Sequence, residues 1–258
     1  MSKRPTHPNR RHPGNGSLLG VFNPKSRSTP LLPKLLGFLV VVLIFVYFFR
    51  RSGENGVKQP LSKIEGDFTC TSEVQRAIPV LKTTYNMNKV LHVGPDTCSV
   101  VSKLLKEEEE TEAWGIEPYD IEDSARNCKI LVRKGIVRVA DIKFPLPYKE
   151  NSFSLVIISD AVDYLSIKYL NKTIPELARV SSDGLVIFAG YPGHSRAKVQ
   201  ELSKFGRPAK MRSSSWWSQF FSQAKLNENQ DARKTFEQSA TKTSYKSGCQ
   251  ILHLKSNP

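Results

Sequence analysis

Short apolar runs in this sequence each end in groups that could bind a ligand. The groups that follow the first four runs are, in chain order, Gly94-Pro95-Asp96, Glu117, Asp141 and Asp160. The carboxyl ends of parallel strands meet at one edge of a sheet, and ligands bind there. An acid about twenty residues after a first glycine turn binds ribose hydroxyls in nucleotide-binding sheets, and Glu117 lies 23 residues after Gly94. The spacing therefore predicts a site for a nucleoside-containing cofactor, and a solvated acid at a strand end is the alternative interpretation of Glu117.

A fifth apolar run is followed by the segment GYPGHSR, which contains His194 and Arg196. Basic and hydrogen-bonding groups at this edge are candidates for contacts with a bound ligand. An ordinary polar loop with a solvated arginine is the alternative, and the sequence leaves the choice open.

The elements that must position these groups alternate between strand and helix patterns. The expected strands are 89–93, 113–117, 136–141, 153–160 and 185–189, and the expected helices between them are 98–110, 121–134 and 164–181. This alternation predicts an α/β fold with a doubly wound, mostly parallel sheet.

Both ends of this region depart from the alternation. A helix is expected near 214–226, followed by weaker strands near 235–240 and 249–255 that would form an antiparallel edge. Before the first strand, residues 72–81 have a helical pattern with Ser72 as its cap, and Pro79 is expected to kink or end that helix.

Four stretches resemble the successive motifs of class I S-adenosylmethionine-dependent methyltransferases over about 85–258. They are VLHVGPDTC, WGIEPYD, VRVADIKFPLPYKENSFSLVIISDAVDYL and ELARVSSDGLVIFAG. The third stretch carries the family's spacing from an acid through Leu-Pro to Ser-Phe, matched here by Asp141, Leu146-Pro147, Ser152 and Phe153. With the anchor described below, the chain resembles the plant cotton Golgi-related family of pectin methyltransferases.

The resemblance implies S-adenosylmethionine as the cofactor and a Rossmann-like fold. It also implies that Gly94, with Pro95 and Asp96, forms the turn beside the methionine moiety, Glu117 holds the ribose, Asp141 faces the adenine amino group, and Asp160 lines the pocket. The first motif departs from the family, because His92 replaces its acid and Asp96 and Cys98 replace two glycines. A non-catalytic scaffold of a Golgi wall-polysaccharide synthesis complex is therefore the alternative function.

The acceptor that the resemblance implies is the galacturonic acid carboxylate of homogalacturonan. A uronate is ionised at the pH of the Golgi lumen, so it can accept a methyl group without a general base. Catalysis would then consist of positioning this carboxylate and excluding water, with His194 and Arg196 as the positioning candidates. Golgi polysaccharide synthases are expected as partners.

The N-terminal quarter predicts a single-pass membrane anchor. Residues 1–30 have the composition of a disordered, basic cytosolic tail, residues 31–49 contain fifteen consecutive uncharged positions, and residues 50–67 form a Gly-, Pro- and charge-rich stalk. A helix of nineteen residues spans roughly 28 Å, close to the thickness of a thin bilayer core. The remaining residues, 68–258, would form the lumenal domain of a type II Golgi protein.

The charge supports this orientation. Seven of the 38 basic residues and none of the 24 acids precede residue 50, so half of the net charge of +14 lies there. A pI of 9.7 would also suit a nucleic-acid-binding protein, but a lumenal domain would not meet nucleic acid.

Three further features bear on the lumenal domain. Four cysteines without a CxxC pair argue against a zinc site, and in an oxidising lumen they could pair in three ways.

Asn171 begins a glycosylation sequon, although the expected helix there would hinder access. Trp216, Trp217, Phe220 and Phe221 could form a sugar-stacking platform, but their helical spacing favours core packing.

Overall fold

A six-stranded mixed sheet organises the residues that the computed structural model describes, which are 64–65, 68–107, 110–118, 126–194, 198–199 and 208–256. They belong to one unit, Gln59–Pro258. The predicted tail, the predicted anchor and most of the predicted stalk lie outside these residues. Within the described ranges, no helix combines the length and the hydrophobicity that crossing a bilayer requires.

The order of the strands in the sheet is β4-β3-β2-β5-β6-β8. Their bounds are β2 Lys89–Val93, β3 Glu112–Glu117, β4 Val137–Val139, β5 Phe153–Ser159, β6 Ser181–Ala189 and β8 Gln250–Leu254. The first five are parallel, and β8 is antiparallel to β6. A separate two-residue antiparallel pair joins β1 (Ile64–Glu65) to β7 (Lys198–Val199). The chain order reverses between β2 and β5, which is the switch point where such sheets bind ligands.

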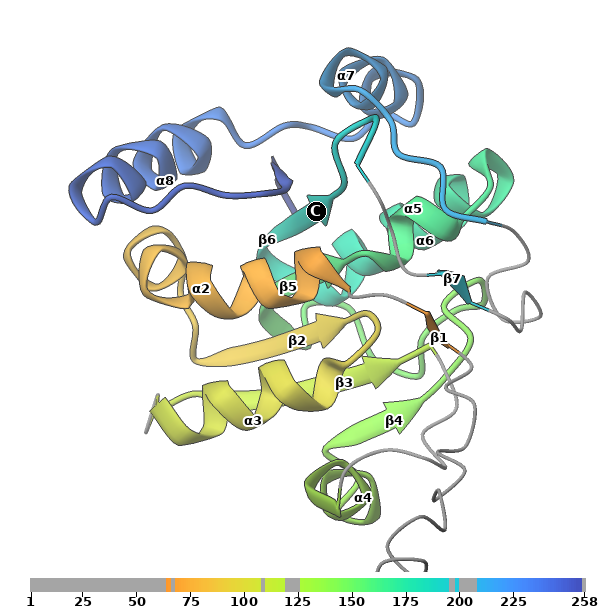
Figure 1. Cartoon of the computed structure of the whole chain (residues 1–258), viewed down its shortest axis with the longest axis vertical. Helices are drawn as coiled ribbons and strands as arrows, with labels where there is room; N and C mark the ends of the chain where they lie inside the picture. Colours follow the sequence, from red (N-terminus) through yellow and green to blue (C-terminus); the bar gives the residue numbers. More distant parts are fainter. Residues whose placement is uncertain are drawn as a thin grey trace, which may run out of the picture. The chain divides into compact units, whose positions relative to one another are not determined.

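Both faces of the sheet are covered by helices, as Figure 1 shows. One buried cluster contains side chains of α2 (Thr69–Thr84), α3 (Thr97–Glu107), α4 (Arg126–Arg133) and α8 (Gln230–Lys242). The other contains side chains of α5 (Ala161–Tyr164), α6 (Ile167–Val180) and α7 (Ser214–Gln223). This arrangement confirms the predicted doubly wound, mostly parallel sheet.

The central strands are apolar throughout because each side of each strand meets a helical layer. In β5, Val156 and Ile158 join one cluster while Leu155 and Ile157 join the other, and all four are fully buried. Alternation between two apolar layers gives the continuous hydrophobic run that predicted a buried parallel strand.

The prediction that Pro79 ends or kinks its helix at that point is wrong in part, because α2 continues five residues further to Thr84. Pro79 lies on the exposed side of α2, where the carbonyl left without an N–H donor can face water. Ser72 is not the cap either, since α2 already begins at Thr69.

The helix expected over 164–181 is interrupted, because Leu165 and Ser166 have extended backbone conformations between α5 and α6. Arg212 compensates for the interruption. Its guanidinium donates to the carbonyl oxygens of Val162 and Leu165 at 3.1 and 2.7 Å. A residue almost fifty positions away thus satisfies the carbonyls that a continuous helix would have paired, which local periodicity could not reveal.

The strand expected over 235–240 is wrong, because these residues belong to helix α8. Asn229 caps that helix by accepting a hydrogen bond from the Ala232 N–H at 3.1 Å. Ala232 and Phe236, four residues apart, are its buried positions. The antiparallel edge was correctly expected, but the single strand β8 provides it.

Candidate active site

A tight turn joins β2 to α3 at the switch point of the sheet. The Gly94 N–H donates to the Ile116 carbonyl of β3 at 3.1 Å. A Cβ atom at Gly94 would lie 2.6 Å from the Ser159 carbonyl oxygen of β5, so no larger residue fits here. The glycine singled out from the sequence therefore brings the ends of β2, β3 and β5 together.

Glu117, at the end of β3, points its carboxylate at this turn. Its side chain is buried, and its Oε2 accepts a hydrogen bond from the Thr97 N–H at 3.0 Å. Thr97 is the first residue of α3, so the carboxylate lies at the positive end of a helix dipole. A buried acid at this position is the feature that ribose recognition requires in sheets of this kind.

Asp141 follows β4 at the same edge. The Ala140 N–H donates to the Glu117 carbonyl at 3.1 Å, which places the ends of β3 and β4 side by side. The Asp141 carboxylate is partly exposed and pairs with the Lys143 ammonium at 3.2 Å. The structure thus brings Gly94, Glu117 and Asp141 to one edge, as the sequence predicted.

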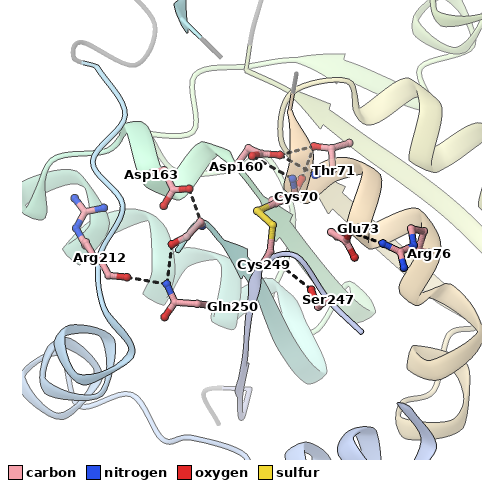
Figure 2. The surroundings of a disulfide bond; sticks show 12 residues. Cys70, Thr71, Glu73, Arg76, Asp160, Asp163, Arg212, Ser247, Cys249 and Gln250 are labelled. Atoms are coloured by element: carbon pink, nitrogen blue, oxygen red, sulfur yellow. Dashed lines mark hydrogen bonds and ion pairs between the residues drawn. A yellow bond between two sulfur atoms is a disulfide. The ribbon is translucent and has the colours of Figure 1, made fainter. Parts of the chain in front are cut away.

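Asp160 lies at this edge too, but it is fully buried and bonded to the start of α2 (Figure 2). Its Oδ2 accepts hydrogen bonds from the Thr71 N–H at 2.7 Å and the Thr71 hydroxyl at 3.1 Å, and its Oδ1 accepts one from the Cys70 N–H at 3.4 Å. Asp160 has a φ of 52°, which is uncommon for a residue other than glycine. Its carboxylate therefore caps a helix 90 positions away in the chain.

His92, whose only mark in the sequence is that it departs from the family's first motif, lies in a buried chain of hydroxyl groups. His92 Nδ1 lies 2.7 Å from Thr97 Oγ1, and its Nε2 lies 3.0 Å from Ser159 Oγ. Ser159 Oγ in turn lies 2.7 Å from Thr71 Oγ1, next to Asp160. Burial lowers the pKa of the His92 imidazole to about 3, so the ring is neutral.

The end of β6 is held by two neighbouring segments. The Gly190 N–H donates to Asp163 Oδ2 at 2.9 Å, and the Gly190 carbonyl accepts from Gln250 Nε2 at 2.7 Å. Figure 2 shows these bonds beside the Cys70–Cys249 disulfide. His194 follows this strand and is exposed, while Arg196 lies outside the described residues. Their predicted role in positioning an acceptor stays a prediction.

All four cysteines are paired, as Cys70–Cys249 and Cys98–Cys128. Of the three connectivities that the sequence left open, the fold selects this one by bringing the Cα atoms within 5.8 and 5.2 Å. The first bridge links the start of α2 to the segment before β8, and the second links α3 to α4.

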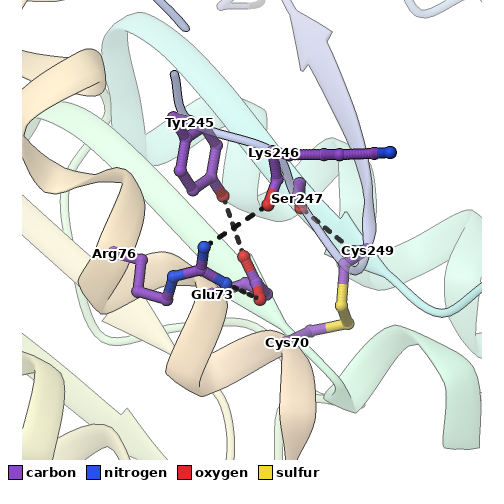
Figure 3. Close-up of polar contacts among 7 residues, drawn as sticks. All are labelled: Cys70, Glu73, Arg76, Tyr245, Lys246, Ser247 and Cys249. Carbon is purple, nitrogen blue, oxygen red and sulfur yellow. Dashed lines mark hydrogen bonds and ion pairs between the residues drawn. A yellow bond between two sulfur atoms is a disulfide. The ribbon is translucent and has the colours of Figure 1, made fainter. Parts of the chain in front are cut away.

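A polar cluster reinforces the first bridge (Figure 3). The buried Glu73 carboxylate accepts hydrogen bonds from Arg76 Nη1 at 2.7 Å and from the Tyr245 hydroxyl at 3.1 Å. Burial, the largest of several influences, raises the pKa of Tyr245 to about 12, so the phenol keeps the proton that it donates. The 245–249 segment is thus attached to α2 by both a covalent and a polar contact.

Comparison with known sequences identifies close relatives. No family model matches the sequence. "Probable pectin methylesterase CGR3" of Arabidopsis thaliana is 62% identical over 244 residues, which cover 94% of this chain and 94% of that protein. "Probable pectin methylesterase CGR2" of the same plant is 61% identical over 259 residues, covering 99% of each. The chain belongs to the CGR2 and CGR3 family. The family resemblance drawn from the motifs is therefore confirmed.

Solved structures align more loosely. The O-methyltransferase NcsB1 from neocarzinostatin biosynthesis, in complex with S-adenosyl-L-homocysteine, is 15% identical with a TM-score of 0.46, covering 73% of this chain and 57% of that chain. A SAM dependent methyltransferase from Aquifex aeolicus is also 15% identical, with a TM-score of 0.45 and coverage of 72% and 92%. At these TM-scores the overlap carries no information about the function of this member of the CGR2 and CGR3 family.

The aromatic cluster of α7 packs mainly in the core, as its spacing indicated. Trp217, Phe220 and Phe221 are buried against the sheet, and only Trp216 is half-exposed. The Trp216 ring is stacked on Phe220 at a centroid distance of 5.2 Å, and the Arg212 guanidinium lies 4.7 Å from its centroid. The cluster is therefore not an open stacking platform of four rings.

The predicted glycosylation site lies on α6. Asn171 is exposed, whereas the Thr173 hydroxyl of the same sequon is buried and donates to the Ile142 carbonyl at 2.8 Å. Glycosylation would have to precede folding of this helix, and the occupancy of Asn171 stays a prediction. The described part of the chain contains no group of three or more His, Cys, Asp or Glu side chains that could hold a metal ion.

Proposed function

We propose that this chain is an S-adenosylmethionine-dependent carboxyl O-methyltransferase that esterifies the galacturonic acid residues of homogalacturonan. The observation that carries the proposal is the buried Glu117 carboxylate, bonded to the first N–H of α3 beside the Gly94 turn. This arrangement suits the ribose of a nucleoside cofactor at the switch point. Membership of a family whose Arabidopsis proteins are named for pectin methyl esters points to pectin as the acceptor.

The described residues fit S-adenosylmethionine as that cofactor. Glu117 would hold the ribose hydroxyls, the Gly94-Pro95-Asp96 turn would lie beside the methionine moiety, and Asp141 would face the adenine amino group. Asp160 would support the site indirectly by holding the start of α2, because its oxygens already accept hydrogen bonds from the N–H groups there. When bound, the cofactor supplies a sulfonium methyl group that an ionised carboxylate accepts without loss of a proton.

CGR2 and CGR3 carry names that denote hydrolysis of a methyl ester rather than its formation. Hydrolysis by a serine enzyme needs a nucleophile and a base that the substrate can reach. The Ser159–His92 pair has the required contact of 3.0 Å, but both side chains are fully buried and the imidazole pKa is about 3. This pair connects strands to helices inside the fold, where a substrate cannot reach it. Its burial therefore favours the transferase over a hydrolase that would use these two residues.

Two features support the Golgi lumen as the compartment. Two disulfides are typical of proteins that fold in an oxidising compartment. The uncharged run within 31–49, preceded by basic residues only, suits a type II signal anchor. Association with Golgi polysaccharide synthases follows from the same proposal, whereas nucleic acid would not be present there.

The test is methyl transfer by the full-length chain in detergent micelles. With methyl-labelled S-adenosylmethionine and polygalacturonate, we expect label in the polymer that mild alkali releases as methanol. Release of methanol from methylated pectin without any labelling of polygalacturonate would overturn the proposal. An alkali-stable label on a neutral polymer would show that the carboxylate is not the acceptor.

Glu117→Gln is the matched variant for this experiment, because glutamine keeps an oxygen for the Thr97 N–H but loses the charge. Loss of charge-assisted bonds to the ribose should weaken cofactor binding by about 1.5–3 kcal/mol, roughly ten- to a hundredfold. Equal affinity of folded Glu117→Gln and wild type would remove this residue from the site. A wild-type protein that binds no cofactor would favour the non-catalytic scaffold.

A further inference from the structure

A cavity of about 240 Å³ lies between the start of α6 and the segment that leads into α7. It is lined by Ile167 at the start of α6, by residues 210–213, and by Trp216 of α7. None of these residues belongs to the turn or to the strand-end acids described above. The cavity is therefore a candidate for the acceptor rather than for the cofactor.

Hydrogen bonds fix the wall of this cavity to the edge of the sheet. The Lys210 N–H donates to the Asp163 carbonyl at 2.7 Å, and the Arg212 carbonyl accepts from Gln250 Nε2 at 2.7 Å. Asp163 lies three residues beyond Asp160, and the same Gln250 amide holds Gly190 after β6. The 210–213 segment is thus anchored to α5, which follows β5, and to the first residue of β8, which pairs with the end of β6. This is the edge of the sheet to which an acceptor must come.

The lining of the cavity is positively charged. Lys210 is exposed, and its ammonium takes part in none of the ion pairs among the described residues. Arg212 adds a second cation, and no described acidic side chain lines the cavity. Helix α7 begins at the same wall with no acid in its first turn, so its dipole also favours an anion.

The rest of the lining is apolar and firmly held. Trp216 is fixed between packing partners, since the Arg212 guanidinium lies 4.7 Å from its centroid and Phe220 is stacked on it. Ile167 is 53% exposed and adds an aliphatic side chain to the lining. A cation beside an aromatic and aliphatic wall matches a sugar ring that carries a carboxylate, with C–H groups on one side and a charge at one corner.

We infer that this cavity is a subsite for a galacturonate residue next to the one being methylated, with the carboxylate of that neighbour against Lys210. The inference rests on the proposed function. It adds that the protein recognises the negative charge of the sugars next to the acceptor. Stretches of unesterified galacturonate should therefore bind better than stretches that are already methyl-esterified.

The test is binding of a fluorescently labelled oligogalacturonate to the full-length chain in micelles at fixed ionic strength. Lys210→Met should raise the Kd roughly three- to thirtyfold, the range between an exposed ion pair and a charge-assisted hydrogen bond. Lys234→Met on α8 is the matched control, because it removes the same charge from an exposed position outside the cavity. This control should change the Kd by less than about twofold, and Lys210→Arg should largely restore binding.

A second probe, the same oligosaccharide with methyl-esterified carboxyl groups, isolates the role of charge. The wild type should prefer the free acid, and Lys210→Met should lose most of that preference. Equal effects of Lys210→Met and Lys234→Met, or an unchanged preference in Lys210→Met, would overturn the subsite. A wild type that binds the oligosaccharide through Lys210 but transfers no methyl group would instead contradict the proposed function alone.

Discussion

His92 connects two strands of the sheet to the starts of two helices through hydrogen bonds. It lies on β2, contacts Thr97 of α3 through Nδ1 and Ser159 of β5 through Nε2, and reaches Thr71 of α2 through Ser159. All four side chains are almost completely buried. A neutral imidazole can accept at one nitrogen and donate at the other, which suits a chain of hydroxyl groups in a buried site.

Protonation of His92 links the stability of the fold to pH. Burial lowers the folded-state pKa of His92 to about 3, whereas the ordinary value in the unfolded chain is about 6.5. Between these values the unfolded state binds more protons, so stability is fully present above about pH 6.5 and is lost as pH falls. At pH 5 this loss is about 2 kcal/mol for His92. His253, whose pKa is lowered to about 4 mainly by burial, adds a loss of the same sign.

Denaturant unfolding of the full-length chain between about pH 5 and 7.5 measures this effect. His92→Gln, which keeps one donor and one acceptor, should be less stable at the upper end of this range but should show a shallower decline toward the lower end. His253 titrates in both proteins and serves as an internal reference. Parallel pH profiles of the two proteins would mean that His92 does not titrate on unfolding.

Contacts with distant segments hold the first turns of helix α2 in place. Asp160 caps its first N–H groups, the Cys70–Cys249 disulfide ties its first turn to the segment before β8, and Glu73 holds Tyr245. Figures 2 and 3 show these contacts along one side of the helix. The position of α2 over the sheet is therefore set by segments far away in the chain.

The two disulfides should contribute unequally to the free energy of unfolding. Cys70–Cys249 closes a loop of 179 residues and Cys98–Cys128 closes one of 30. Cys70→Ala with Cys249→Ala should lower the free energy of unfolding by roughly 2–5 kcal/mol, and by about 1.5 kcal/mol more than Cys98→Ala with Cys128→Ala, because the longer loop restricts the unfolded chain more. Denaturant titrations of both double variants check this order. A larger loss from the shorter loop would show that native contacts, not loop closure, dominate.

Positive charge is unevenly distributed along the whole chain. Half of the net charge of +14 precedes residue 50, and the remaining half belongs to the part of the chain that would meet a polyuronate. A surplus of positive charge raises the local concentration of an anionic polymer, and salt screens this attraction over roughly 8–10 Å. The proposed orientation puts each half of the charge where it has a partner, namely anionic lipid and pectin.

The corresponding prediction is a protease-protection result in sealed microsomes. A tag after Pro258 should resist added protease until detergent is present, while a tag before Met1 should be digested at once, because the basic side of an anchor stays cytosolic. A native lumenal protein of the same microsomes reports on their integrity. Protection of the N-terminal tag instead would reverse the orientation and contradict the Golgi-lumen proposal.

Local sequence patterns are sufficient to predict the sheet and most of the residues at its edge. Runs such as Lys89–Val93 and Phe153–Ser159 are apolar enough to be buried on both faces, and parallel strands bring their carboxyl ends together whatever the details of packing. The positions of Gly94, Glu117 and Asp141 at one edge therefore follow from the order of residues in the chain. The same patterns miss the α8 helix, because Thr235 and Phe236 favour strands locally, while burial of Ala232 and Phe236 four residues apart favours a helix.

Which distant groups meet depends instead on tertiary packing. The cysteine pairing, the capping of α2 by Asp160 and the support of α5 by Arg212 join positions that are 30 to 179 residues apart. The cavity beside Lys210 likewise depends on the anchoring of the 210–213 segment to Asp163 and Gln250. Local patterns report periodicity over one or two turns, whereas these contacts depend on how the two helical layers close over the sheet.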